Sequence, residues 1–155
     1  MTPAITTVKK NSVPHQIHEF SHDDSSGSYG LEAAKKMSVS ELRVFKTLVV
    51  ALDEQSFAVG VIPVSSQLSM KRFAKELGAK KAVMADKVDV ERVTGYVLGG
   101  VSPLGQKKRL KTVIDQSAND FSTIYVSAGR RGLEIELSPN DVRIFTDGRF
   151  ADICQ

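Results

Sequence analysis

The stretch Val44-Phe45-Lys46-Thr47-Leu48-Val49-Val50-Ala51-Leu52 is dominated by β-branched and apolar side chains. Asp53-Glu54-Gln55 then separates it from a second apolar run, Ser56–Val64. Two apolar runs joined by a few polar residues are typical of a β-hairpin. The sequence therefore predicts a hairpin over residues 44–64, and the remaining elements are assigned outward from it.

Helices and strands are mixed along the rest of the chain. Thr2 followed by Pro3 predicts a helix N-terminus, and this helix is expected to run to about Asn11. Further helices are expected over residues 31–37, 69–77 and 86–93 and from Ser138-Pro139 onward, with further strands over 15–20, 81–85, 110–114, 122–127 and 133–137. The strands are too irregularly spaced for a regular βαβ succession. We therefore predict one α+β domain over residues 1–155, with a mixed, mostly antiparallel sheet curled toward a barrel and helices packed around it.

The composition is that of a globular protein rather than a membrane or disulfide-rich one. Of the 155 residues, 41% are apolar and 25% are charged. No apolar run approaches the roughly 20 residues that span a bilayer, and the N-terminus lacks a secretory pattern. Cys154 is the only cysteine, which excludes an internal disulfide, and its place near the chain end argues against catalysis. We expect a cytoplasmic protein without a membrane segment.

Positive charge is concentrated in the middle of the sequence. The net charge is +3, but residues 71–111 contain 11 Lys and Arg against 4 Asp and Glu, a local excess of +7. Such a stripe is often only a solvated surface, and charge alone leaves this interpretation and a nucleic-acid interface equally open.

Lys46 interrupts an otherwise apolar run. If Val44, Lys46, Leu48 and Val50 share one face of a strand, the lysine points where apolar groups point. A buried ammonium group is costly unless anions or carbonyls meet it, so such lysines tend to be functional. The alternative is an edge-strand lysine whose ammonium group reaches water, and the residues alone favour this alternative.

The segment Gly95–Lys111 combines glycines, a proline and a basic run. Its Gly100–Gly105 part invites comparison with the G-x-S-x-G nucleophile elbow, but Leu104 replaces the second glycine. Pro103 also follows Ser102 and lacks the backbone N–H that the elbow's oxyanion hole requires. Ser102 is therefore not expected to be a nucleophile, and a structural turn and a ligand-contacting loop remain equally open.

The remaining polar clusters give no metal or cofactor motif. His15, His18 and His22 do not have a zinc or iron spacing, so no metal is predicted, although His22 beside Asp23 could orient a substrate. The turn Gly129-Arg130-Arg131-Gly132 could bind phosphate or form a solvated hairpin tip. Walker A, dinucleotide, CxxC and HExxH patterns are absent, and no cofactor is predicted.

Several sequence blocks nevertheless match a known family. They are Thr2-Pro3-Ala4, His22-Asp23, Phe45-Lys46-Thr47-Leu48, Thr94-Gly95-Tyr96, Gly99-Gly100-Val101-Ser102-Pro103-Leu104-Gly105-Gln106-Lys107-Lys108-Arg109, Ile124-Tyr125-Val126-Ser127 and Gly129–Leu133. With these blocks the chain resembles the YbaK/EbsC family, and within it the YbaK branch of aminoacyl-tRNA deacylases. Members are related to the editing domain of bacterial prolyl-tRNA synthetases. The resemblance spans nearly the whole chain.

The resemblance implies an activity and a set of site residues. It implies clearance of wrongly attached amino acids, notably cysteine on proline tRNA, without a cofactor. The acceptor end of a mischarged tRNA would be one partner, and prolyl-tRNA synthetase is a second candidate. The implied catalytic residues are Lys46 and Gly99; the implied substrate-binding residues are Phe20, His22, Thr47, Gly100, Ser102, Pro103 and Ser127; the implied tRNA-binding residues are Lys107, Lys108, Arg109 and Arg130. Phe20 departs from the family, because an aromatic hydroxyl is expected at this position.

The mechanism expected from these residues is catalysis by placement. No cysteine or elbow serine is placed to attack, which disfavours a covalent intermediate on the protein. The substrate's own thiol could attack its ester and leave a thiolactone and free tRNA. An alanine- or serine-directed hydrolase of the same fold and a tRNA- or protein-binding regulator without catalysis stay open as alternatives.

Overall fold

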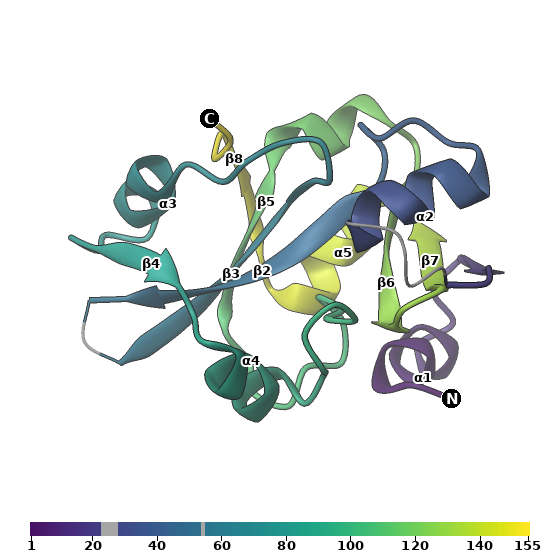
Figure 1. Cartoon of the computed structure of the whole chain (residues 1–155), viewed down its shortest axis with the longest axis horizontal. Coiled ribbons are helices and arrows are strands. Elements are labelled where there is room, and N and C mark those ends of the chain that lie inside the picture. Colours follow the sequence, from purple (N-terminus) through teal and green to yellow (C-terminus); the bar gives the residue numbers. More distant parts are fainter. Residues whose placement is uncertain (23–27, 54) are drawn as a thin grey trace.

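A computed structural model describes residues 1–22, 28–53 and 55–155 (Figure 1). The pairing of His22 with Asp23 lies outside this described part. The helices are α1 (Pro3–Lys10), α2 (Tyr29–Met37), α3 (Met70–Glu76), α4 (Lys87–Thr94), the 3-10 helix η1 (Gln116–Asp120) and α5 (Pro139–Thr146). The strands are β1 (Gln16–Glu19), β2 (Phe45–Leu52), β3 (Ser56–Pro63), β4 (Ala82–Met84), β5 (Lys111–Asp115), β6 (Ile124–Arg130), β7 (Leu133–Leu137) and β8 (Arg149–Ala151). None of the helices in these ranges is long and apolar enough to cross a membrane.

The predicted hairpin forms the centre of a five-stranded sheet. The strand order is β4-β2-β3-β5-β8. Strands β2 and β3 are antiparallel, with Phe45 opposite Pro63 and Leu52 opposite Ser56. Strand β5 runs parallel to β3, and β8 runs parallel to β5, so the sheet is mixed.

A second, antiparallel sheet has the order β1-β7-β6. A single parallel bridge between Val44 and Tyr125 links it to the start of β2. Helices α1 and α2 lie at this end of the molecule, whereas α3 packs beside β4 at the other end (Figure 1). The α+β prediction is confirmed, and the strands form two sheets that are joined at one bridge without closing into a barrel.

Local signals placed the helix ends correctly. The Ile5 N–H donates to the Thr2 hydroxyl at 3.2 Å, and Pro3 is the first residue of α1. Gly95 ends α4 in the left-handed conformation, with φ of 80°. Neither η1 nor β8, which is only three residues long, was expected from local sequence signals.

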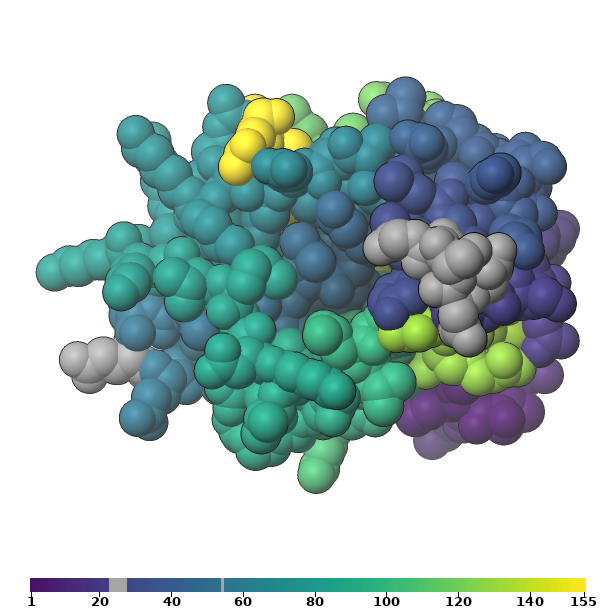
Figure 2. All heavy atoms as spheres, viewed as in Figure 1, coloured from purple at the N-terminus to yellow at the C-terminus, as the bar shows by residue number. Residues whose placement is uncertain are grey.

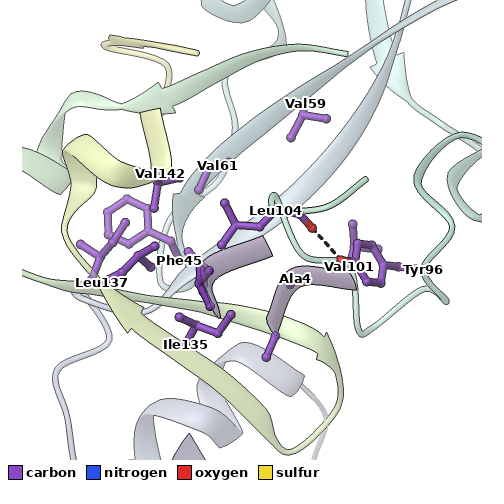
Figure 3. Close-up of a cluster of buried hydrophobic side chains, with 14 of the residues drawn as sticks. Ala4, Phe45, Val59, Val61, Tyr96, Val101, Leu104, Ile135, Leu137 and Val142 are labelled. Atoms are coloured by element: carbon purple, nitrogen blue, oxygen red, sulfur yellow. Dashed lines mark hydrogen bonds between the residues drawn. The ribbon is translucent and has the colours of Figure 1, made fainter. Parts of the chain in front are cut away.

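The main core lies where both sheets and the helices meet, and it includes part of the glycine segment. Figure 3 shows Val101 and Leu104 among side chains from β2, β3, β7 and α5. The Tyr96 hydroxyl donates to the Leu104 carbonyl at 2.6 Å, and burial raises the pKa of Tyr96 to about 12. Residues 95–105 therefore form a fixed, core-anchored connection rather than a free loop.

Candidate active site

One cavity lies between the two sheets, beneath α2. Its volume is about 350 Å³. It is lined by Phe20, Ser28, Tyr29, Gly30, Glu32, Val44, Phe45, Lys46, Thr47, Leu48, Val64, Leu98, Gly99, Val101, Ser127, Arg130, Arg131, Gly132 and Glu134. Figure 2 views the face on which α2, β2 and the β6–β7 turn meet, and the surface is recessed between them.

The cavity exists because β2 and β6 separate after their single bridge. The Val64 N–H donates to the Val44 carbonyl at 2.8 Å, which makes this an antiparallel hydrogen-bonded pair. Since such pairs alternate along the strand, the backbone polar groups of Phe45 and Thr47 face the opposite edge, away from β3. On that edge β4 pairs only with Val50–Leu52. The first half of β2 therefore presents its backbone toward the cavity.

Lys46 is half-buried on the cavity wall. Its side chain shares a face of β2 with Leu48 and Val50, as the alternation predicts. Burial lowers the pKa of the Lys46 ammonium group. Within the described chain, no carboxylate forms a salt bridge with Lys46. The ammonium group is thus available to an incoming anion or carbonyl.

Glu134 is a cavity residue that the sequence reasoning missed. It lies on β7 directly opposite Ser127 on β6. Only 7% of Glu134 is exposed, and burial raises the pKa of its carboxyl group to about 8. The alternating acidic pattern of residues 133–137 shows that Glu134 and Glu136 share a face, but it does not show that only Glu134 is buried and lines the cavity.

Glu136 has the opposite electrostatic environment. Its carboxylate accepts a hydrogen bond from the Thr123 hydroxyl at 2.7 Å, and it lies 2.9 Å from Nε2 of His18. The Thr123 hydrogen bond, assisted by His18 and Arg43, lowers the pKa of Glu136 despite partial desolvation. The pKa values of these two glutamates, which lie two positions apart on one strand, are therefore shifted in opposite directions.

The exposed rim of the cavity is formed by Tyr29, Gly99 and Arg131. The Arg131 guanidinium carbon lies 3.6 Å from the centre of the Tyr29 ring, a cation–π contact. Arg131 Nη1 is 3.3 Å from His22 Nε2, and His22 Nδ1 is 2.8 Å from the buried carboxylate of Glu32. Gly99 has φ of 95°, and a Cβ atom there would lie 2.6 Å from Tyr29 Cε2 and 3.0 Å from Arg131 Nε. The glycine allows the backbone to close against the rim.

The comparisons with known proteins agree on one family. The family model for the aminoacyl-tRNA editing domain matches residues 28–145. A protein of Enterococcus faecalis named "Putative Cys-tRNA(Pro)/Cys-tRNA(Cys) deacylase EbsC" is 38% identical over 152 residues, which are 98% of this chain and 92% of that protein. This chain belongs to the aminoacyl-tRNA editing domain family.

Two further relatives place this editing domain in context. A proline–tRNA ligase of Lactobacillus helveticus is 27% identical over 99% of this chain, which corresponds to only 26% of the ligase. The solved structure of "a putative trans-editing enzyme for prolyl tRNA synthetase" superposes with a TM-score of 0.85, covering 98% of this chain and 95% of that chain. Its sequence identity is 17%, so this likeness supports the fold alone.

The editing-domain fold brings together about half of the predicted site residues. Phe20, Lys46, Thr47, Gly99, Ser127 and Arg130 all line the cavity. His22 lies beside the rim through its contacts with Glu32 and Arg131. Arg130 is exposed and forms an ion pair with Glu19 at 2.7 Å.

The other predicted residues lie away from the cavity. Ser102 is fully buried, and its hydroxyl accepts the Leu104 N–H at 3.2 Å. Gly100 is buried against the Arg130 backbone. Pro103, Lys108 and Arg109 line a different cavity, of about 340 Å³, together with residues of α1 and α5. Lys107 is exposed and is not among the lining residues of this second cavity; its backbone N–H donates to the Thr94 carbonyl at 2.9 Å.

Among the described residues, neither the Cys154 thiol nor the Ser127 hydroxyl is activated as a nucleophile. Burial, reinforced by Asp115, raises the pKa of the Cys154 thiol to about 12, so this thiol stays protonated at neutral pH. The Ser127 hydroxyl accepts the Gly129 N–H at 3.1 Å. No histidine is among the described lining residues, and no cluster of three metal-ligating side chains occurs in the described ranges.

Proposed function

We propose that the protein is a deacylase that removes cysteine from mischarged Cys-tRNA(Pro). The observation that carries the proposal is the cavity with Lys46 on one wall and Gly99 at its rim. Its volume of about 350 Å³ suits an aminoacyl group with the terminal ribose at the entrance. The 38% identical relative from Enterococcus faecalis carries Cys-tRNA(Pro) in its name, which supports the same substrate here.

In this proposal, catalysis depends on how the protein positions the reacting groups of the substrate, and no protein side chain acts as the nucleophile. The cysteinyl thiol attacks its own ester carbonyl; the S–C bond forms and the C–O bond to the ribose breaks. The thiol proton passes to the leaving ribose oxygen, and the products are a thiolactone and free tRNA. Holding thiol and carbonyl in a near-attack geometry supplies much of the acceleration. The apolar walls from Phe20, Val44 and Leu48 hold the side chain and exclude water.

Lys46 and the backbone at the cavity supply the electrostatic part. An ammonium group in a poorly solvated wall stabilises the negative charge that develops on the ester oxygen or on the leaving ribose oxygen. The unpaired edge of β2 and the Gly99 backbone offer polar atoms at fixed positions. These groups are held by the fold before the substrate arrives, so little reorganisation is required during the reaction.

The acceptor end of the tRNA would approach over the rim. Arg130 and Arg131 lie at the cavity entrance, where they can meet the terminal phosphates without reading the base sequence. Lys108 and Arg109 line the second cavity, and in this proposal they and the adjacent Lys107 contact the acceptor stem farther from the ester. Prolyl-tRNA synthetase is the proposed protein partner, since the Lactobacillus helveticus ligase carries a matching segment within its own chain.

A panel of charged tRNAs tests the proposal. Purified protein is incubated with cysteinyl-, alanyl-, seryl- and prolyl-tRNA(Pro), and the remaining ester is measured over time. Rapid loss of cysteine with intact proline supports the proposal; preferential loss of alanine or serine shows the hydrolase alternative. Intact ester in every case, together with tRNA binding, shows a non-catalytic binder.

A matched pair of esters tests the thiol step. Seryl-tRNA(Pro) retains the size of the side chain but replaces the thiol, and S-methylcysteinyl-tRNA(Pro) blocks the thiol. Both are expected to be cleaved at least about 10-fold more slowly than the cysteinyl ester, because neither provides the attacking group. Equal rates for seryl and cysteinyl esters would show that water is the nucleophile.

A further inference from the structure

Among its described lining residues, the cavity has two carboxyl groups that the proposed mechanism does not use. Glu32 is hydrogen-bonded to His22. For Glu134, no hydrogen bond or salt bridge to another described residue is formed, although the side chain lines the cavity and is 7% exposed. An acidic side chain so deeply buried without a partner is unusual in proteins.

Three cationic side chains line the same cavity, but they do not neutralise Glu134. Burial raises the pKa of its carboxyl group, and within the described chain no salt bridge joins Glu134 to Lys46, Arg130 or Arg131. Arg130 is paired with Glu19, and Arg131 stacks on Tyr29. The protein thus leaves the carboxyl group of Glu134 facing the cavity and without a cation.

Such a carboxyl group favours a ligand that brings its own positive charge. A cation in contact with the carboxylate compensates its desolvation, whereas a neutral ligand leaves this cost in place. In an aminoacyl ester with a small uncharged side chain, the α-ammonium group is the only cation of the aminoacyl part. Glu134 therefore distinguishes an aminoacyl ester from a simple acyl ester.

The position of Glu134 in the sheet fits this assignment. Glu134 is directly opposite Ser127, and both lie on the small-sheet wall. The facing wall is the first half of β2, where Lys46 lies and the backbone of Thr47 faces the cavity. An aminoacyl group between these walls has its ammonium group near one charged residue and its ester near another.

We propose that Glu134 is the receptor for the substrate's α-ammonium group, so that the site accepts free aminoacyl-tRNA and rejects tRNA whose amino group is blocked or missing. This inference rests on the proposed deacylase function. It adds a substrate requirement that neither Lys46 nor the apolar walls impose. Peptidyl-tRNA and N-acylated aminoacyl-tRNA are the chemical classes that it excludes.

The test compares three esters of the same tRNA(Pro) on the wild-type protein. They are the cysteinyl ester, the N-acetylcysteinyl ester and the 3-mercaptopropionyl ester, which keeps the thiol but lacks the amino group. We expect kcat/KM to be about 10- to 100-fold higher for the cysteinyl ester, the range that a hydrogen bond to a charged group provides. Cleavage of all three esters at equal rates overturns the inference and leaves the deacylase function intact. Cleavage of none overturns both.

Variants then assign the preference to Glu134. In Glu134→Gln the preference for the cysteinyl ester over the other two is expected to fall to within about 3-fold, mainly through KM. Glu134→Asp keeps the charge and is expected to retain part of the preference, which guards against a folding defect in the glutamine variant. Glu136→Gln, two positions along the same strand, is the matched control and is expected to keep the wild-type preference. A Glu134→Gln protein that loses activity equally on all three esters, or keeps the full preference, overturns the assignment.

Discussion

Replacing Glu134 by glutamine removes a strongly perturbed carboxyl group of the cavity with little change in side-chain size. The folded protein holds the proton of this group more tightly than the unfolded chain does, because its pKa is about 8 instead of 4.5. The contribution of this proton to stability is fully present below pH 4.5. It is lost progressively as the pH rises toward 8, since the folded state binds more protons over this window.

The size of the effect follows from the two pKa values. Each pKa unit corresponds to 1.36 kcal/mol, so the loss between pH 4.5 and pH 8 has an upper bound of about 5 kcal/mol. Glu134 lines an open cavity, and water that hydrates the carboxylate reduces the loss, so we expect about 2 to 3 kcal/mol. Glutamine cannot ionise. The free energy of unfolding of Glu134→Gln should therefore rise relative to the wild type by this amount between pH 5 and pH 9.

Urea denaturation followed by circular dichroism at pH 5, 7 and 9 measures this difference. Glu136→Gln is the matched control, because Thr123, assisted by His18 and Arg43, lowers the pKa of Glu136. Its contribution is present above the unfolded pKa and is lost only as the pH falls through the folded value. The difference between Glu136→Gln and the wild type should thus be constant from pH 7 to pH 9. Parallel curves for Glu134→Gln and the wild type from pH 5 to pH 9 would refute the burial argument.

Three further perturbations test the site. Lys46→Met keeps the apolar stem and removes the charge, so deacylation should fall about 100-fold, whereas the midpoint of thermal unfolding should hardly change. Gly99→Ala should reduce activity at least about 10-fold by displacing the rim; Gly78→Ala, at φ of 70° with no atom within 4 Å of the added Cβ, reports the backbone strain alone and should keep full activity. Arg131→Ala should raise KM and weaken the salt dependence of KM. Both effects should be larger than those of the triple alanine replacement of residues 107–109, because Arg131 lies at the cavity entrance. A larger effect of the triple replacement would place the tRNA contact at the second cavity.

The parts of the fold that could be predicted are those with local signals. The hairpin of β2 and β3 follows from two apolar runs with a polar turn, and the first helix follows from Thr2 and Pro3. These patterns act within a few residues, so a single sequence displays them. The bridge between Val44 and Tyr125, which creates the cavity, joins positions far apart in the chain and has no local pattern.

In the candidate site too, features with a local sequence pattern could be predicted, whereas features that depend on contacts between distant residues could not. The alternation around Lys46 predicted its apolar surroundings, and the structure adds that no described carboxylate pairs with it. Glu134 is buried and Glu136 is partly exposed because different segments surround them in the fold, which the alternation of residues 133–137 cannot reveal. Ser102 matched a family block, but it lies inside the core, because residues near a binding loop in sequence also serve to anchor that loop.

Among the described residues, the cavity walls come from separated parts of the chain: Phe20, residues 28–32, 44–48, Val64, 98–101 and 127–134. No single element can form the site before the two sheets have met, so a partly folded chain has no affinity for the ligand. Binding is then linked to the global unfolding equilibrium rather than to a local one, and a ligand at 100 times its dissociation constant adds about 2.7 kcal/mol to the stability of the whole domain. A non-hydrolysable aminoacyl analogue would thus shift the entire unfolding transition as one, and this shift reports occupancy of the site without any catalytic readout.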